Sequence, residues 1–105
     1  MKEFFIAGVQ HHEAHTVQND LEEGLELTMR LEPNNPYDPN AIALIYNADG
    51  EEDDTMLGYV PAKFSGEIVA ILLTTDDVVC TLTQVDLKAK QWERYKVKIE
   101  EVDYA

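Results

Sequence analysis

The sequence has a single cysteine, no long hydrophobic run and few basic residues, and each shortage excludes a class of protein. Its one thiol, Cys80, cannot form an internal disulfide framework, so a reducing compartment suits the chain. No apolar stretch reaches the roughly 18 residues that a membrane span requires. Residues 1–10 show no secretory cleavage pattern. We therefore expect a cytoplasmic domain that does not enter a membrane.

The shortage of basic residues leaves a strongly negative chain. Eight Lys and Arg stand against 21 Asp and Glu, for a formal net charge of −13. Residues 1–55 hold 2 basic and 13 acidic side chains, whereas residues 56–105 hold 6 and 8. Such a field repels polyanions and disfavours loose binding to duplex nucleic acid. Any nucleic acid bound here has to be held by a local site.

Apolar residues are nevertheless plentiful. They make up 45% of the 105 residues, too many for a disordered chain and enough for one compact domain with a core. We find no internal repeat, low-complexity tract or linker. The sequence therefore predicts a single domain over residues 1–105.

Most of the apolar residues follow the two-residue period of β-strands. Residues 25–31 show it best, because Leu25, Leu27 and Leu31 face one way and polar or charged residues face the other. The predicted strands are 3–9, 25–31, 41–46, 56–60, 78–85 and 95–102.

Residues 62–73 depart from this period. Phe64 and Ile68 lead a set of apolar residues at helical spacing, with Ser65 as a candidate N-cap and Glu67 in the first turn. One short helix among about six antiparallel strands predicts a mainly β fold. A small barrel of the OB-like or SH3-like kind fits this pattern best.

The loop between the second and third predicted strands is rigid and polar. It contains three prolines in seven residues, within the string EPNNPYDPN (32–40). Proline fixes φ, and Asn and Asp side chains bond to nearby backbone groups, so such a loop is stiff. Tyr37 and Asp38 could serve a ligand there, or Tyr37 could simply fold back onto the barrel. The spacing alone leaves both interpretations open.

Three blocks of sequence carry a resemblance to a known family. They are FIAGVQHH (5–12), LEPNNPYDPNAIAL (31–44) and LGYVPAKFSGEIVAIL (57–72). In this order and at this spacing they make the chain resemble the HIRAN domain, which occurs in helicase-like proteins and as stand-alone bacterial proteins. The family is associated with DNA repair and replication. The resemblance implies a modified OB-like β-barrel.

The resemblance also implies a function. The HIRAN domain of a helicase-like transcription factor captures single-stranded DNA by its free 3′-hydroxyl end. Similarity to it implies a non-catalytic nucleic-acid-binding module that needs no cofactor. By the same resemblance, Asp38 would accept a hydrogen bond from the terminal hydroxyl and Tyr37 would stack on a base. The other contacts that it implies come from Asn35 to base or backbone, from His11 as a second stacking ring, and from Tyr59 and Lys63 at the site.

Three positions depart from the family pattern. Gln10 and Ala62 stand where basic residues are found in relatives, with Lys63 one residue beyond Ala62, and His11 stands where an aromatic residue is common. These losses leave a second function open, an acidic protein–protein interaction module that mimics nucleic acid and no longer binds DNA. Negative charge around the Tyr37 loop would favour that alternative. Charge confined to the far side would favour DNA binding.

The histidine cluster HHEAH (11–15) is a weak candidate metal site. In an extended segment His11, Glu13 and His15 would share one face, with His12 on the other. No fourth ligand is evident, and the spacing differs from the helical pair of zinc proteases. We favour a polar strand end and expect no metal. An enzyme would need a metal here, because no phosphate-binding glycine loop or serine nucleophile elbow is present.

Three further patterns in the sequence are better explained by structure than by a binding or catalytic site. Residues 87–98 carry five basic side chains interleaved with Trp92 and Tyr95, a pattern also found in strand-tracking nucleic-acid sites. We favour a hairpin whose edge lysines oppose aggregation while Trp92 packs on the barrel. Cys80 lies in an apolar strand and predicts a buried thiol. The acidic residues of 49–54 lack the ligand spacing of a calcium loop and predict a solvated turn.

Overall fold

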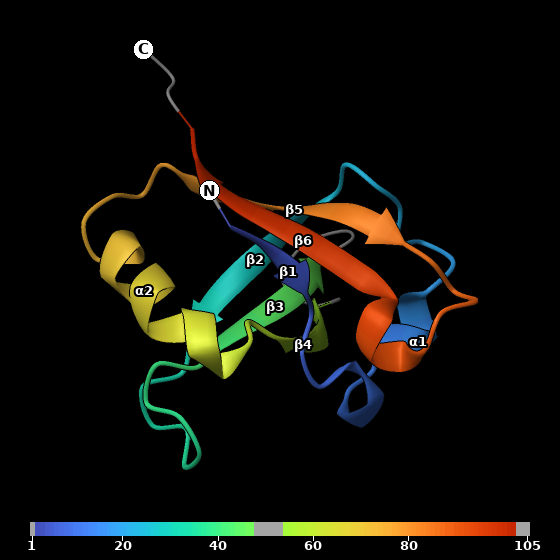
Figure 1. Ribbon diagram of the computed structural model, residues 1–105, viewed down its shortest axis with the longest axis horizontal. Coiled ribbons are helices and arrows are strands. Elements are labelled where there is room, and N and C mark those ends of the chain that lie inside the picture. Colours follow the sequence, from blue (N-terminus) through green and yellow to red (C-terminus); the bar gives the residue numbers. More distant parts are fainter. Residues whose placement is uncertain (1, 48–53, 103–105) are drawn as a thin grey trace.

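The computed structural model describes residues 2–47 and 54–102, so the acidic turn predicted at 49–54 lies, apart from Asp54, outside the described residues. Its strands form one antiparallel six-stranded sheet in the order β1-β6-β5-β2-β3-β4. The sheet curls on itself (Figure 1), which confirms the mainly β, OB-like fold. The elements in chain order are β1 (Lys2–Phe5), the 3₁₀ turn η1 (Val9–His11), α1 (Ala14–Val17), β2 (Glu26–Leu31), β3 (Ile42–Asn47), β4 (Asp54–Tyr59), α2 (Ala62–Leu72), β5 (Val78–Val85), the 3₁₀ turn η3 (Gln91–Glu93) and β6 (Tyr95–Glu101).

Strand β2 is where the sheet changes partners and curls. Its first residues, Glu26 and Leu27, pair with β5, and the rest of the strand pairs with β3. Leu27 is buried, and Leu25 and Met29 pack against the core, as the alternation predicts. Leu31, predicted on the same face, is instead 38% exposed at the end of the strand. The hydrophobic side of β2 therefore lines the inside of the curl.

The segment that follows β1 meets the outer strand β4 at an isolated bridge between Ala7 and Tyr59. The N–H of Ala7 donates to the carbonyl of Tyr59 at 2.8 Å, and the N–H of Tyr59 donates back at 2.9 Å. Gly58 permits this approach, because a Cβ atom there would collide with the carbonyl oxygen of Ala7 and lie 2.6 Å from Ile6 Cγ2. Closure of the sheet therefore requires glycine at this position.

Helix α2 covers one end of the curled sheet, and η1, α1 and η3 gather at the other end (Figure 1). Ile68 is fully buried in the core. The ring of Phe64 stacks on Phe4 with 5.5 Å between centroids. The helical spacing thus predicts α2 to within one residue of its end. Within residues 2–47 and 54–102, no helix is long and apolar enough to cross a membrane.

The predicted N-cap of α2 is wrong. The helix begins at Ala62, directly after Pro61, and Ser65 lies one turn inside it. Proline suits this position, because its fixed φ fits the helix start and its missing N–H is not needed there. The hydroxyl of Ser65 lies 2.9 Å from Asp38 Oδ2. Because the helix starts at Ala62, Glu67 lies beyond its first turn, contrary to the sequence prediction, and it pairs with Lys2 at 3.4 Å.

The first strand is shorter than the predicted 3–9. Strand β1 ends at Phe5, and the chain turns at Gly8, whose φ of 73° lies in the left-handed region that favours glycine. The chain then enters η1 and α1, which the sequence did not predict. These elements bury one residue each, Val9 and Ala14. Segments this short show no period that could reveal them.

The hairpin predicted within residues 87–98 is formed by β5 and β6, but two expectations about it are wrong. Strand β6, which carries Lys96 and Lys98, lies between β1 and β5 in the sheet, so these lysines do not mark an edge. Trp92 is 55% exposed instead of packed on the barrel. Strand alternation turns Tyr95 into the core in its place, while Trp92 lies on η3, outside the strands.

Cys80 is buried in the core, as predicted. Burial raises the pKa of its thiol to about 12. The thiol is therefore protonated and unreactive at neutral pH.

Substitution of Gly58 tests the closure of the sheet. We expect Gly58→Ala to lower the free energy of unfolding by about 1–3 kcal/mol, the usual cost of forcing an atom into a packed site. The matched control is Gly66→Ala in α2, where a Cβ atom would lie 3.5 Å from Asn40 Nδ2, an ordinary contact. That variant should gain about 0.5–1 kcal/mol from helix propensity. Equal stability of the two variants in urea titrations would contradict the closure.

Candidate functional site

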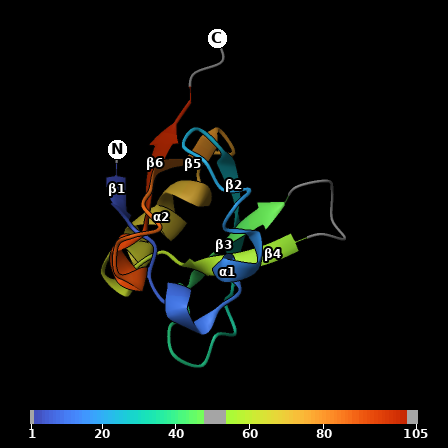
Figure 2. The ribbon, with the colours of Figure 1, turned by 90° about the vertical axis from the view of Figure 1, so that its right-hand side faces the viewer.

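A cleft of about 820 Å³ lies between the β2–β3 loop and the η1 turn. Gly8, His11 and His12 line one side, residues 32–37 line the other, and Tyr59 also lines it. Figure 1 and Figure 2 show that the loop and η1 project from the same side of the sheet. An adjoining cavity of about 260 Å³ shares Asn35, Tyr37 and Tyr59 with the cleft and adds Asp38 and Ala62. Hereafter "the cleft" means both cavities together.

The loop that borders the cleft is held by its own side chains. Asn35 Oδ1 accepts hydrogen bonds from the backbone N–H of Tyr37 at 2.9 Å and of Asp38 at 3.1 Å. Asp38 Oδ1 accepts from the N–H of Asn40 at 2.9 Å. These are the side-chain bonds to the loop's own backbone that the Asn and Asp pattern predicts.

Tyr37 is presented to solvent by this loop. Its side chain is 95% exposed, so it does not fold back onto the barrel. A fixed backbone beneath a free ring is a suitable arrangement for stacking on a planar ligand. The exposure of Tyr37 contradicts the interpretation in which its ring packs on the barrel.

Asp38 is half-buried where the loop meets α2. The hydroxyl of Ser65, itself 1% exposed, lies 2.9 Å from Asp38 Oδ2 and 3.0 Å from the carbonyl oxygen of Ala62. Each carboxylate oxygen of Asp38 thus has one protein partner. A carboxylate has about four acceptor sites, so capacity remains for a ligand donor.

Glu32, at the start of the loop, ties it to the sheet. The hydroxyl of Tyr59 donates to Glu32 Oε1 at 2.7 Å, and Asn35 Nδ2 donates to the same oxygen at 3.2 Å. Arg30 lies 3.4 Å from Oε2. The bond from Tyr59 is the main reason that the pKa of Glu32 is lowered, and the same bond raises the pKa of Tyr59. Sequence reasoning missed Glu32, whose only signal is its place directly before the PNNPYD string.

The histidines lie on turns and not on the extended strand that the metal hypothesis required. His11 is in η1 and His15 in α1, so His11, Glu13 and His15 do not share a strand face. Among residues 2–47 and 54–102 no three metal-ligating side chains come together. His11 lines the cleft, and the ring of His12 meets the Tyr59 ring edge-on at 5.4 Å between centroids.

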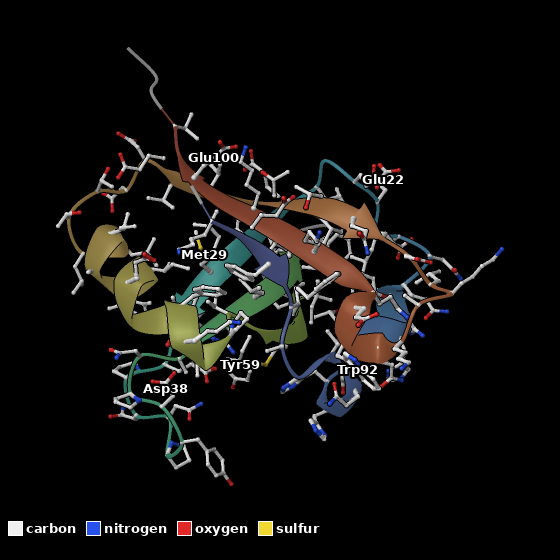
Figure 3. All side chains as sticks on the ribbon, in the orientation of Figure 1. Glu22, Met29, Asp38, Tyr59, Trp92 and Glu100 are labelled. Atoms are coloured by element: carbon white, nitrogen blue, oxygen red, sulfur yellow. The ribbon has the colours of Figure 1, made fainter. Side chains whose placement is uncertain are left out.

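Five of the six predicted site residues come together around the cleft. Lys63 is the exception, because it lines neither cavity and its ammonium lies 5.0 Å from the ring centre of Phe64. Figure 3 shows Asp38 and Tyr59 on the same side of the molecule. The five that gather are His11, Asn35, Tyr37, Asp38 and Tyr59.

The negative charge is placed mostly away from the cleft. Among the acidic residues in the described part of the chain, Glu32 and Asp38 line it. Both are held by hydrogen bonds from protein groups. In Figure 3, Glu22 and Glu100 lie on the opposite side of the sheet from Asp38 and Tyr59. As far as the structure describes the chain, the lining of the cleft thus contains two carboxylates and no Lys or Arg, and both carboxylates are engaged by protein donors.

Comparison with known proteins identifies a matching family model and a related protein. A family model described as HIRAN domain matches residues 1–101. A protein of Oryza sativa subsp. japonica named Fanconi-associated nuclease 1 homolog is 30% identical over 94 residues. That match covers 90% of this chain but 9% of the relative, so the chain spans a small part of that protein's length.

Two crystal structures share the fold. A protein from Lactobacillus plantarum superposes with a TM-score of 0.70 at 18% identity, covering 96% of this chain and 94% of the other. The HIRAN domain of human HLTF superposes with a TM-score of 0.60 at 13% identity, covering 93% of this chain and 69% of the other.

The bond between Tyr59 and Glu32 makes a pH-dependent prediction. Because the pKa of folded Glu32 is lowered, this group stabilises the fold above its unfolded pKa, and that stability is lost as the pH falls through the folded value. We expect Tyr59→Phe to reduce the free energy of unfolding at pH 7 by about 1–3 kcal/mol, since a bond to a charged acceptor is lost. The difference from wild type should shrink when Glu32 is protonated in acid. Urea unfolding of both proteins at several pH values measures this, and a difference independent of pH would contradict it.

Proposed function

The chain belongs to the HIRAN domain family, and on that premise we propose that its cleft binds the free 3′-hydroxyl end of single-stranded DNA. HIRAN domains are DNA-binding domains, so nucleic-acid binding in general follows from membership. The observation that carries the finer proposal is the exposed ring of Tyr37 on a loop fixed by Asn35, next to the carboxylate of Asp38.

Tyr37 supplies the affinity for a base. Stacking of a base on an aromatic side chain contributes about 1–3 kcal/mol and tolerates every base, because each has a π-face. The loop is already ordered by its own hydrogen bonds. Little conformational entropy is therefore lost when a base docks on the ring.

Asp38 supplies the preference for an unmodified end. A carboxylate accepts a hydrogen bond from a terminal hydroxyl, whereas it repels a phosphate placed at the same position. Ser65 and the backbone of Asn40 fix the direction of both carboxylate oxygens. A strand that continues, or that ends in a phosphate, would meet this negative group and be rejected.

The other residues have narrower roles. Asn35 has one amide hydrogen left after bonding Glu32, and this hydrogen can reach a base or the backbone. The hydroxyl proton of Tyr59 is used by Glu32, so Tyr59 offers the ligand its ring and an acceptor oxygen. His11 provides a second ring on the opposite side of the cleft. Lys63 lines neither cavity but follows the cleft-lining Ala62, and we assign it a contact with the strand's phosphates.

The way in which the cleft's carboxylates are used, and not their number, favours this function over an acidic protein-interaction module. A mimic of nucleic acid would carry its negative charge on the binding face. Here the acidic residues of the cleft, Glu32 and Asp38, are used in hydrogen bonds that shape it. We therefore propose that the chain acts as a binding module without catalysis, and that any protein partner uses another face.

Fluorescence anisotropy with a short labelled strand tests the end preference. At low salt we expect the strand with a 3′-hydroxyl to bind at least about tenfold more tightly than the same strand with a 3′-phosphate, since a bond to a charged group is exchanged for repulsion. Asp38→Asn should reduce this ratio, and Asp20→Asn, an equal change of charge at an exposed site outside the cleft, should not. Equal binding of both ends by the wild type would refute end recognition.

Tyr37 can be tested without disturbing the fold, because its side chain is 95% exposed. Tyr37→Ala should weaken binding of the 3′-hydroxyl strand by about 1–3 kcal/mol, which is fivefold or more. Tyr37→Phe keeps the ring and should bind as the wild type does. Leu73→Ala removes another exposed apolar side chain, outside the cleft, and should also leave affinity unchanged. A loss of affinity in Tyr37→Phe equal to that in Tyr37→Ala would argue against stacking.

A further inference from the structure

A third cavity, of about 80 Å³, lies beside the cleft where η1, α1 and η3 meet. We call it the Arg94 pocket. The Arg94 pocket adjoins the cleft, because His12 lines both. The residues that line it and can donate hydrogen bonds are Gln10, His12, His15, Gln91, Arg94 and Tyr95.

Two of these donors are buried and unpaired. Arg94 Nε and the hydroxyl of Tyr95 make no hydrogen bond of good geometry with any described residue, although the Arg94 guanidinium lies close enough to the Tyr95 hydroxyl to oppose the rise in its pKa that burial causes. Tyr95 is 1% exposed, and burial raises the pKa of its hydroxyl, which is therefore protonated and able to donate at neutral pH. Arg94 is held in place by its Nη2, which donates to the carbonyl of Ala89 at 3.1 Å. Unpaired buried donors are rare in folded proteins and call for an acceptor.

The lining of the pocket differs in charge from the chain as a whole. Although the net charge is −13, no acidic residue of the described part lines this pocket. Its polar lining consists of a guanidinium, two imidazoles, two amides and a phenol. Such a set favours an anion with several acceptor oxygens, and a guanidinium matches the geometry of phosphate.

The size of the pocket limits the ligand. At about 30 Å³ for each water molecule, 80 Å³ holds two or three waters or a single phosphate group. A base or a nucleoside does not fit. The buried residues Val9 and Ala14 lie behind it, while exposed Gln10 and Gln91 leave its mouth open to solvent.

We propose that the Arg94 pocket binds a phosphate group, with Arg94 Nε and the Tyr95 hydroxyl as its donors. The phosphate has two possible sources, free inorganic phosphate or a phosphodiester of a strand whose end lies in the cleft. The second source rests on the proposed function, and the first does not. In either case the pocket would bind an anion on a chain whose net negative charge otherwise repels anions.

The test follows the Arg94 Nε–Hε resonance by NMR while inorganic phosphate is added at constant ionic strength. We expect a saturable shift that chloride does not produce. Tyr95→Phe removes one neutral donor and should weaken phosphate binding about two- to tenfold. Arg94→Gln should abolish the saturable shifts at neighbouring amides. Lys88→Gln removes the same charge from an exposed site outside the pocket and should bind phosphate as the wild type does.

A non-saturating response, or equal effects of Arg94→Gln and Lys88→Gln, would overturn the proposal. A second arm adds 3′-hydroxyl strands of increasing length to the phosphate-saturated protein. Displacement of phosphate beyond a certain length identifies a phosphodiester as the source, and binding without displacement identifies free phosphate. If no strand binds while inorganic phosphate still saturates Arg94, the proposed function of the cleft fails and the pocket stands.

Discussion

Two backbone hydrogen bonds between Ala7 and Tyr59 are the constraint on which the rest of the structure depends. They join the segment that follows β1 to the outer strand β4, and they are possible because Gly58 has no side chain. They also bring the η1 turn, which starts just after Ala7, to the face where the β2–β3 loop leaves the sheet. The cleft is the space between these two segments. The same hydrogen bonds that close the sheet therefore also position the two sides of the cleft.

The loop is then fixed to its surroundings at two points. Glu32 binds Tyr59 of β4, and Asp38 binds Ser65 of α2, so the loop is held against both the sheet and the helix. This arrangement uses two carboxylates of a very acidic chain as structural acceptors inside the cleft. It leaves the ring of Tyr37 free. A site with this architecture is formed before the ligand arrives and does not need the positive surface on which most nucleic-acid-binding proteins rely.

The sequence predicts what depends on local pattern and misses what depends on distant contacts. Alternation in residues 25–31 and helical spacing in residues 62–73 predict β2 and α2 closely, and the prolines and asparagines predict the stiff loop. The loop pattern indicates Tyr37 and Asp38 as candidate ligand contacts, and the family resemblance adds Asn35. Neither Glu32 nor Ser65 could be found this way, because their partners lie 27 residues away along the chain. The short turns at Val9–His11 and Ala14–Val17 bury too few apolar residues to show a period.

Backbone amide chemical-shift mapping with a short unlabelled single strand is the most direct test that the cleft is the nucleic-acid site. We predict shifts concentrated on residues 32–38, on Gly8–His12 and around Tyr59, with no shifts in β5 or at Glu22 and Glu100 on the opposite side of the sheet. The shifts should saturate at one strand for each protein molecule. Shifts centred outside the cleft, or none at all at low salt, would contradict it.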